Sequence, residues 1–400
     1  MSSYRVAILS SEYPPHIYGG LGVHVDQITA VIGGLAVCEV FVPEQGDYNC
    51  SNPNIHLLEV PVCGASTDVG YWLNFCKNAV KLANKSDIQV DVIHCHDWMT
   101  VMAGISLRDI LRKPLVFSVH LPQVMGLRGC LENIGLATAD LALVASEAVR
   151  RELISRHLTN HGIEIVPNGV NSSLFCPDPR WPEDGGYVLF VGRLVAQKGV
   201  DTLLRAFKAV LRRCPQSRLV VCGDGDLELY FKRVAHYLGF PHHVSFVEWK
   251  TGQALIQLYQ QSQLVVVPSY YEPFGIVALE AMACGRPVLV SQTGGLQEII
   301  DDGIQGYLAP VGNHLEFARH LVNLINSPKQ RQEMGAAARI RAMEYSWEKA
   351  GRRMIELYSG LVGQSIIPIR VSVVNKLKAE LLNEMGEEMS ATIHSLTDWI

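Results

Sequence analysis

The sequence is poor in the features that mark membrane, nucleic-acid-binding and disulfide-rich proteins. No stretch approaches the roughly 20 apolar residues that cross a bilayer, and the opening apolar run, residues 6–9, is too short for the core of a signal peptide. A formal net charge of -5 offers no broad positive field for polyanions. The 10 cysteines are scattered without a CxxC pair, so reduced, mostly buried thiols are expected. These absences favour a cytoplasmic protein with no transmembrane segment and no nucleic-acid partner.

The chain is long enough for two domains, because a single hydrophobic core seldom keeps growing beyond about 250 residues. Its 400 residues are 48% hydrophobic and 18% charged, as in globular proteins. Short β-branched runs alternate with amphipathic segments in two series, at residues 5–9, 37–42, 90–94, 115–119 and 141–145, and again at residues 187–191, 218–222, 244–247, 264–267 and 287–290. This alternation predicts two α/β domains, each a doubly wound parallel sheet with crossover helices.

A segment rich in proline and glycine, residues 176–186, separates the two series and predicts a domain boundary near residue 182. We therefore expect an amino-terminal domain over residues 1–182 and a carboxy-terminal domain over residues 183–346. A further helix is expected over residues 347–363. Residues 364–400 include a charged helical pattern near residues 375–389, and the sequence assigns them no chemical role.

The loop after the first predicted strand carries several glycines. In open α/β sheets, ligands bind at the carboxyl ends of strands, so such loops are candidate sites. Gly20 lies just before a helical pattern, where backbone amides and the helix dipole favour a phosphate. A plain glycine-rich turn is the alternative. The GxGxxG spacing is missing, so a nicotinamide cofactor is not supported.

Charged side chains occupy two loops of the second series. Arg193 and Lys198 follow a predicted strand and can hold a diphosphate as it leaves, although loop cations are usually only solvated. Glu272 stands before Pro273, and Glu280 lies in the otherwise apolar helix that follows. A carboxylate in such a helix needs a partner. The hydroxyls of a ribose can supply it, and a salt bridge to a neighbouring element is the alternative.

Histidines end two predicted strands of the first series. His120 stands where either a catalytic-face histidine or a capped strand end would be found. His94 and His96 lie at alternate positions, which point to one face of a strand and suggest a metal site. With no third ligand at a recognisable spacing, we expect no metal here.

Six short segments occur together in a characteristic order. Along the chain they are Val166-Pro-Asn-Gly-Val170, the Gly-Arg-Leu loop with its lysine, Cys222-Gly-Asp-Gly225, the Glu-Pro-Phe-Gly segment with its second glutamate, Glu280-Ala-Met-Ala-Cys-Gly285 and Gly294-Gly295. In this order and spacing they resemble glycosyltransferase family 4, and the resemblance covers residues 4–362. It implies the GT-B fold, with two Rossmann-like domains facing a cleft and a carboxy-terminal helix that returns to the amino-terminal domain. It also implies a retaining transfer that needs no cofactor and no metal.

The resemblance assigns the donor to the carboxy-terminal domain. Arg193 and Lys198 would bind the donor diphosphate, Gly20 of the other domain would close on it, and Glu280 would bind the ribose. Further donor-binding positions would be Gly192, Phe274, Gly275 and Ile276.

The resemblance also implies the residues around the transferred sugar. Glu272 would bind hydroxyls of that sugar and His120 would lie against it, so the expected catalytic set is His120, Arg193, Lys198 and Glu272. The acceptor side would contain His96, Asp97, Trp98 and Arg128. Arg150, Arg151 and Arg156 are further phosphate contacts to consider, although helix-surface arginines are usually solvated.

Glucosyl transfer is the expected reaction, because residues 11–24 with the segment His96-Asp97-Trp98 look most like the glucan-synthase branch, which uses UDP-glucose or ADP-glucose. An α-glucan is the favoured acceptor. Only residues 121–131 separate His120 from a helix expected near Glu132, fewer than in larger glycogen synthases, so transfer to fructose 6-phosphate, as by sucrose-phosphate synthase, is the alternative. A nucleotide-sugar epimerase and a catalytically silent sugar-binding subunit stay open, because one fold hosts many functions.

Overall fold

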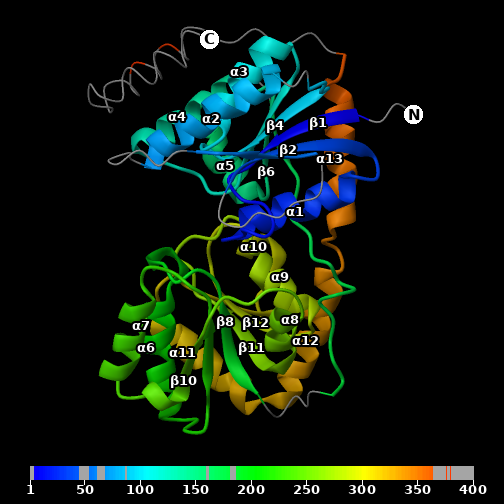
Figure 1. Cartoon of the computed structure of the whole chain (residues 1–400). Coiled ribbons are helices and arrows are strands. Elements are labelled where there is room, and N and C mark those ends of the chain that lie inside the picture. Colours follow the sequence, from blue (N-terminus) through cyan, green and yellow to red (C-terminus); the bar gives the residue numbers. More distant parts are fainter. Residues whose placement is uncertain are drawn as a thin grey trace. The chain divides into compact units, whose positions relative to one another are not determined.

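The computed structural model describes residues 4–44, 54–60, 68–85, 88–158, 162–180 and 186–363, together with residues 375 and 379. The chain divides into two compact units (Figure 1): Met1–Val166 with Ala350–Ile400, and Pro167–Lys349. The expected boundary near residue 182 lies outside the described residues, and the division falls earlier in the chain, after Val166. The expectation for residues 364–400 also lies outside the described part, apart from residues 375 and 379.

The first unit is built on a seven-stranded sheet in the order β3-β2-β1-β4-β5-β6-β7, in which every pairing is parallel. Its strands are β1 (Tyr4–Leu9), β2 (Ala36–Pro43), β3 (Ile55–Leu58), β4 (Val92–His96), β5 (Leu115–Val119), β6 (Leu141–Val144) and β7 (Ile163–Ile165). Its helices are α1 (Gly20–Ile32), α2 (Asp68–Lys85), α3 (Val101–Leu111), α4 (Gly126–Thr138), α5 (Glu147–Ile154) and, from Ala350 onward, α13 (Trp347–Leu361). The edge strands β3 and β7 were not predicted, because they are only partly buried and lack the continuous apolar run that marks a strand covered on both faces.

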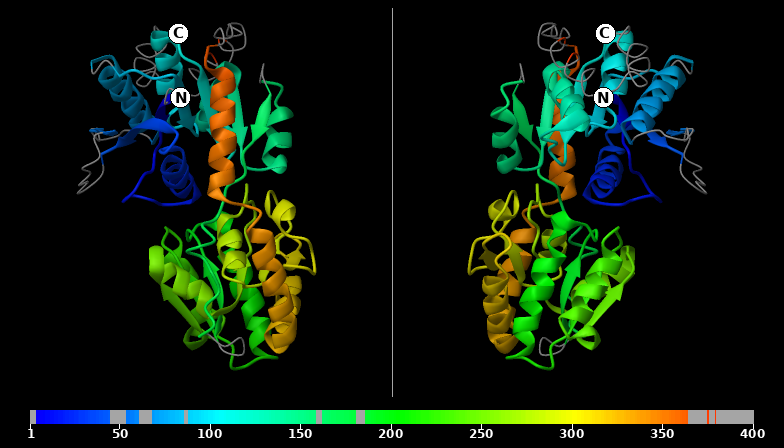
Figure 2. Two further views of the ribbon diagram at one scale, coloured as in Figure 1. Left: turned by 90° about the vertical axis from the view of Figure 1, so that its right-hand side faces the viewer. Right: turned by 90° about the vertical axis from the view of Figure 1, so that its left-hand side faces the viewer.

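Alternation along β4 places its side chains on two covered faces of the first sheet. Cys95 belongs to the apolar core that contains residues of α2, α3 and α4. His94 points to the opposite face, where its Nδ1 lies 2.6 Å from the hydroxyl of Tyr358 on α13. Gly351 of α13 lies against Val31 of α1, since a Cβ at that glycine would be 2.5 Å from the valine side chain. Thus α1 and the carboxy-terminal helix share this face (Figure 2).

The second unit has a six-stranded sheet in the order β10-β9-β8-β11-β12-β13, again with only parallel pairings. Its strands are β8 (Tyr187–Val191), β9 (Leu219–Cys222), β10 (Val244–Val247), β11 (Ser262–Val267), β12 (Val288–Ser291) and β13 (Gly306–Ala309). Its helices are α6 (Val200–Leu211), α7 (Glu228–Tyr237), α8 (Gly252–Gln261), α9 (Ile276–Ala283), α10 (Leu296–Ile299), α11 (His314–Asn326) and α12 (Pro328–Ala342), with short 3₁₀ turns at Ala196–Lys198 and Pro241–His243.

Both sheets reverse their direction of growth at a central pair of strands. In the first sheet the pair is β1 and β4, and in the second it is β8 and β11. The loops that leave such a pair diverge, which opens a crevice at the carboxyl ends of the strands where ligands bind in this class of fold. The prediction of two doubly wound α/β units is confirmed. Among the described helices, none combines the length and apolar character needed to span a bilayer.

Candidate functional site

The loop after β1 is organised by Glu12. One carboxylate oxygen of Glu12 accepts hydrogen bonds from the backbone amides of Tyr18, at 2.9 Å, and Gly19, at 3.1 Å. A Cβ at Gly22 would lie 2.7 Å from this oxygen, so a larger residue would push the loop away from Glu12. Helix α1 then begins at Gly20, whose amide belongs to the unbonded first turn of the helix. The predicted phosphate-facing glycine therefore stands at a true helix start.

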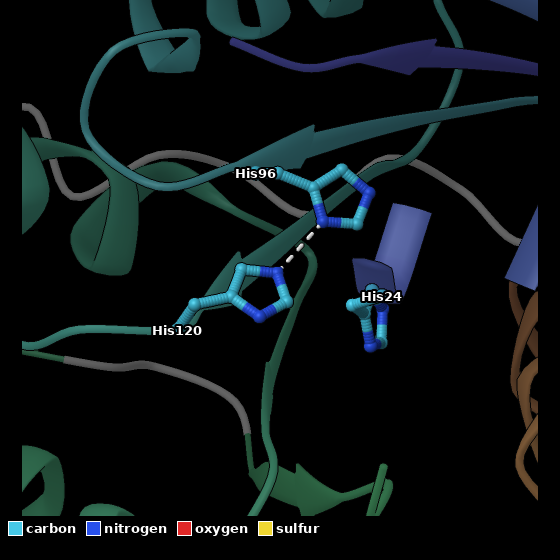
Figure 3. A group of neighbouring side chains, drawn as sticks. All are labelled: His24, His96 and His120. Carbon is cyan, nitrogen blue, oxygen red and sulfur yellow. Dashed lines mark hydrogen bonds between the residues drawn. The ribbon is translucent and has the colours of Figure 1, made fainter. Parts of the chain in front are cut away.

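Three histidines meet at the carboxyl edge of the first sheet (Figure 3), and we refer to them as the histidine cluster. His24 comes from α1, His96 ends β4 and His120 follows β5. Nδ1 of His96 lies 2.9 Å from Nε2 of His120, and the rings of His24 and His120 are 4.6 Å apart between centroids. Two members were predicted site residues, and the fold brings them into contact. The sequence reasoning missed His24, whose only signal was its place at the end of the glycine-rich motif.

Three histidines of this region, His94, His96 and His120, are neutral at physiological pH. Burial is the main cause that lowers the pKa of His96 and of His120 well below the ordinary value, and neighbouring histidines lower both further. Burial likewise lowers the pKa of His94 to about 3. Each neutral ring keeps one N–H donor and one nitrogen lone pair. The contact between His96 and His120 is therefore a hydrogen bond that uses one of each.

Asp97 joins the two strand ends. Its backbone has a φ of 58°, in the left-handed region, and its Oδ1 accepts a hydrogen bond of 2.6 Å from the backbone amide of His120. Burial is the main cause that raises the pKa of Asp97 to about 8, and the nearby charge of Glu132 contributes. Beside it, Trp98 is buried, and the guanidinium carbon of Arg128 lies 5.4 Å from the centre of its ring. The structure therefore joins His96 and Asp97 directly to His120, and it places Arg128 over the ring of Trp98.

The loop after His120 is shorter than the sequence suggested. Helix α4 begins at Gly126, not near Glu132, so only residues 121–125 separate it from His120. The apolar pattern that predicted this helix begins one to two turns after the first residue of α4. Gly126 and Gly129 interrupt the pattern in the first turns, because glycine is a poor helix former. Arg128 consequently lies in the first turn of α4, at an exposed position.

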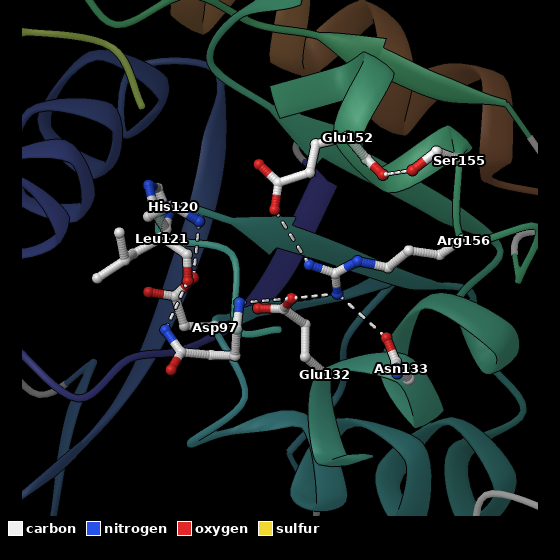
Figure 4. Close-up of polar contacts among 9 residues, drawn as sticks. Asp97, His120, Leu121, Glu132, Asn133, Glu152, Ser155 and Arg156 are labelled. Atoms are coloured by element: carbon white, nitrogen blue, oxygen red, sulfur yellow. Dashed lines mark hydrogen bonds and ion pairs between the residues drawn. The ribbon is translucent and has the colours of Figure 1, made fainter. Parts of the chain in front are cut away.

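Arg156 serves a structural ion pair (Figure 4). Its guanidinium donates to Oε1 of the fully buried Glu132 at 2.7 Å and to Asn133 at 3.1 Å. Glu132 also accepts from the backbone amide of Gln123 at 2.9 Å, which fastens the loop after His120. Burial raises the pKa of Glu132 to about 7. Of the arginines considered as phosphate contacts, Arg156 therefore has a structural role, because its guanidinium is bonded to Glu132 and Asn133.

The other two helix arginines are also bonded within the first unit. Arg150 donates to the carbonyl of Ile163 and pairs with Glu147, and Arg151 pairs with the same carboxylate. Arg128, by contrast, lies over the ring of Trp98, one of the predicted acceptor residues.

In the second unit, glycines let two loops approach the end of β8. Gly192 has a φ of 154°, and a Cβ at Gly223 would lie 1.9 Å from the carbonyl oxygen of Gly192. The loop after β8 is then joined to the loop after β11 by a hydrogen bond of 2.8 Å from the amide of Tyr270 to the carbonyl of Gln197. The two predicted donor loops therefore form one connected surface.

An ion pair links the predicted donor residues. Nζ of Lys198 lies 2.7 Å from Oε2 of Glu272, and the hydroxyl of Ser269 donates to the same oxygen at 3.1 Å. Arg193 stands on the same loop as Lys198 and is exposed. One predicted cation is thus neutralised by a predicted carboxylate, while the other faces outward.

Backbone amides gather at the start of α9. Gly275 caps this helix with a φ of 112°, Phe274 before it is buried, and Ile276 is the first helical residue. The carbonyl of Glu272 accepts from the amide of Gly295 at 3.0 Å, which holds the loop in place. The amides at this helix start can bind an anionic group.

Glu280 is buried in α9, and its partner is a phenol. The hydroxyl of Tyr259, on α8, donates to Oε2 of Glu280 at 2.7 Å. Burial raises the pKa of Glu280 to about 7, and the hydrogen bond from Tyr259 opposes this rise only in part. The sequence left a ribose or a salt bridge open. No pattern in the sequence pointed to Tyr259, because α8 and α9 meet only in the folded unit.

Comparison with known proteins now places the chain in a family. Residues 18–174 match the model for Glycosyltransferase Family 4, and residues 176–341 match that for Glycosyl transferases group 1. An uncharacterized glycosyltransferase of Methanocaldococcus jannaschii is 31% identical over 386 residues, which span 88% of this chain and 97% of the relative. The chain belongs to glycosyltransferase family 4. It is a nucleotide-sugar-dependent hexosyltransferase.

Other relatives and a solved structure agree with this membership. A D-inositol 3-phosphate glycosyltransferase of Corynebacterium diphtheriae is 29% identical, over 90% of this chain and 95% of its own. The sucrose-phosphate synthase of Thermosynechococcus elongatus superposes with a TM-score of 0.77 at 24% identity, covering 90% of this chain and 99% of the synthase. At that identity the superposition establishes the fold, which is GT-B.

The buried Glu280 predicts a stability that depends on pH. Its pKa is raised from 4.5 to about 7, so the folded protein holds more protons than the unfolded chain in this window and stability falls as pH rises through it. Glu280→Gln removes this titration and should stabilise the second unit at pH 8 by about 3 kcal/mol, with most of the gain lost at pH 5. Thermal unfolding of both proteins at the two pH values measures it.

The matched control is Glu333→Gln, at an exposed position of α12, which should change the melting temperature little at either pH. A melting temperature of Glu280→Gln below wild type at pH 8 would show that the ionised carboxylate is itself stabilised by the fold, contrary to the account.

Proposed function

We propose that the protein is a retaining glucosyltransferase whose second unit binds UDP-glucose or ADP-glucose and whose first unit binds a small phosphorylated acceptor, a sugar phosphate or a polyol phosphate. Retention of configuration is typical of family 4. The reaction uses no cofactor and needs no metal, because the diphosphate is met by cationic side chains and backbone amides. The described cysteines carry free thiols, which suits a cytoplasmic enzyme.

The ion pair between Lys198 and Glu272 is the observation that carries the donor site. These two residues lie on the loops that follow β8 and β11, and the order of the second sheet reverses between those two strands. A nucleotide sugar offers a diphosphate to a lysine and hydroxyl groups to a glutamate, so a bound donor can replace each partner of the pair with one of its own groups. The departing diphosphate is then stabilised by Lys198 and Arg193.

The buried carboxylate and the start of α9 extend this site. Glu280 has its Oε2 bonded to Tyr259, and we assign the carboxylate to the ribose hydroxyls. The amides of Phe274, Gly275 and Ile276 lie where a helix start favours negative charge, and we assign them to the diphosphate and the sugar. Gly192 lets the backbone of the loop after β8 approach the donor closely. Gly20, at the start of α1 in the first unit, is likewise assigned to close contact with the donor phosphates.

The acceptor is assigned to the first unit, around His120. This histidine would lie against the transferred sugar, with His96, Asp97 and Trp98 beside it. A phosphorylated acceptor is supported by Arg128, an exposed cation in the first turn of α4, where the helix dipole also favours an anion. Two proteins to which this chain is similar carry a phosphate in their names, the inositol 3-phosphate glycosyltransferase and the sucrose-phosphate synthase.

An α-glucan is the second candidate acceptor. It is favoured by the motif at residues 11–24 together with His96-Asp97-Trp98. The short connection of residues 121–125 after His120 offers less surface for a chain of glucose units, which places the glucan second.

The donor and acceptor can be identified together. Incubation with UDP-glucose and ADP-glucose separately, each with fructose 6-phosphate, inositol 3-phosphate, fructose, inositol and glycogen, should release nucleoside diphosphate fastest with one donor and a phosphorylated acceptor. The unphosphorylated sugars are the matched controls. Faster release of nucleoside diphosphate with glycogen than with the phosphorylated sugars would show that the acceptor is a glucan and not a small phosphorylated molecule. Conversion of the donor to its epimer, with no dependence on any acceptor, would contradict transfer itself.

Lys198 tests the donor site. Lys198→Ala should lower kcat roughly 100-fold, because a charge that meets the leaving diphosphate is lost. The side chains of Lys198 and Glu272 are only 20% and 13% exposed, so loss of the lysine leaves a largely buried carboxylate without its cation and should also lower stability by about 3 kcal/mol. The kcat is therefore compared at a temperature at which the variant is fully folded. Lys208→Ala, at an exposed site on α6, is the control and should retain wild-type kcat. Near-normal turnover by Lys198→Ala with the donor identified above would remove Lys198 from the mechanism.

A further inference from the structure

The histidine cluster has the composition and spacing of a metal site. His24, His96 and His120 each present one ring nitrogen, and these three nitrogens lie within 4.8 Å of one another. They form the one such group of three found among the described residues. We propose that this cluster binds a divalent transition-metal cation of the Zn²⁺ class, and that the bound cation inhibits transfer.

The distances need only small side-chain adjustments to reach coordination. Zn²⁺ takes imidazole nitrogens at about 2.0–2.1 Å, which places two tetrahedral ligands roughly 3.3 Å apart. Nδ1 of His96 and Nε2 of His120 are already 2.9 Å apart, so a cation between them requires a slight opening of that pair. The ring of His24 must then move toward them, from centroid distances of 4.6 Å to His120 and 5.5 Å to His96.

The three ligands stand on separate elements that the fold holds in place. His96 ends β4, and its backbone amide donates to the hydroxyl of Thr100 at 3.0 Å. His120 is fixed through its own amide by Asp97, at 2.6 Å. His24 lies in the second turn of α1 and is 3% exposed. A site whose backbone is set before the ion arrives loses less entropy on binding.

The chemistry of the donor set selects the class of cation. A set of three imidazole nitrogens suits Zn²⁺, Cu²⁺ and Ni²⁺, whereas Mg²⁺ and Ca²⁺ prefer oxygen ligands. His24 and His96 are buried, but His120 is partly exposed, so a water can complete a four-coordinate site from that side. The proton now shared between His96 and His120 moves to the second nitrogen of the donating ring, so both facing lone pairs can reach the ion.

Binding of the cation has a consequence for catalysis, and this part rests on the proposed function. The ion would occupy Nε2 of His120, the residue assigned to the transferred sugar. It would also break the hydrogen bond through which His96 orients His120. A metal at this site therefore competes with transfer, in agreement with a reaction that needs no metal of its own.

Binding can be tested without any substrate. The full chain, freed of metal by a chelator, is titrated with Co²⁺, whose visible absorption reports a four-coordinate site, and Zn²⁺ is then added to displace it. We expect one equivalent of Co²⁺ with an intense tetrahedral spectrum that Zn²⁺ abolishes. In the wild-type protein, ¹⁵N spectra of the imidazoles should show three histidines shifting together with Zn²⁺. Absence of both signals would overturn the proposal, whether or not the protein transfers sugar.

Variants assign the site. His24→Gln and His96→Gln should each weaken Co²⁺ binding by roughly 100-fold or more, since even loss of an outer-shell partner costs 10- to 100-fold. His242→Ala, an exposed histidine of the second unit, is the control and should bind like wild type. Unchanged affinity in both glutamine variants would mean that the ion binds elsewhere and would refute the site.

Inhibition is measured last, as the ratio of transfer rates without and with Zn²⁺. That ratio should be large for wild type and for His242→Ala and should fall toward one for His24→Gln. Equal inhibition of wild type and His24→Gln would contradict the inhibitory role.

Discussion

The site depends on one constraint, the parallel direction of every strand pairing in both described sheets. Parallel strands deliver all of their following loops to one edge, and the order of each sheet reverses at a single pair of strands. In the first unit that pair is β1 and β4, and in the second it is β8 and β11. His24 and His96 belong to the elements at the first reversal, and Lys198 and Glu272 to the loops at the second. Residues far apart in the sequence become neighbours for this reason.

Close approach of the loops to the strand ends requires glycine. A side chain at Gly223 would strike the carbonyl of Gly192, and one at Gly294 would lie 2.0 Å from the carbonyl of Glu272. These glycines bring charged side chains together in a partly desolvated place, where the charges must be matched. Lys198 and Glu272 neutralise each other. Glu280 accepts a hydrogen bond from the uncharged phenol of Tyr259 and is buried, so its ionisation is costly. We propose that a bound donor supplies the missing partners.

The sequence predicted the two doubly wound units and all of their central strands, because buried parallel strands leave plain β-branched runs between helical segments. It did not predict the edge strands β3, β7 and β13, which are only partly buried and therefore lack a continuous β-branched run. Lys198, Glu272 and Glu280 were predicted as site residues from their motifs, and His96 and His120 from their place at strand ends together with the family resemblance, and these roles stay predictions. The sequence could not identify Tyr259, Glu12 and His24, because these residues make contacts between different segments of the folded chain, and no local pattern predicts such contacts. The start of α4 was misplaced because two glycines interrupt its first turns.

The central claim is that Glu280 binds the ribose of a nucleotide held by the second unit. The direct measurement is the affinity, by calorimetry, of wild type and of Glu280→Gln for UDP and ADP and for their 2′,3′-dideoxy analogues. The four affinities for each nucleotide form a cycle that shows whether the carboxylate and the ribose hydroxyls interact. If the carboxylate holds the ribose hydroxyls, wild type should lose at least about 10-fold in affinity for the dideoxy form of the nucleotide that binds, corresponding to about 1.4 kcal/mol. The variant should then discriminate far less between the two forms. The same loss in wild type and variant would contradict the claim, since the hydroxyls would then be bound by other groups.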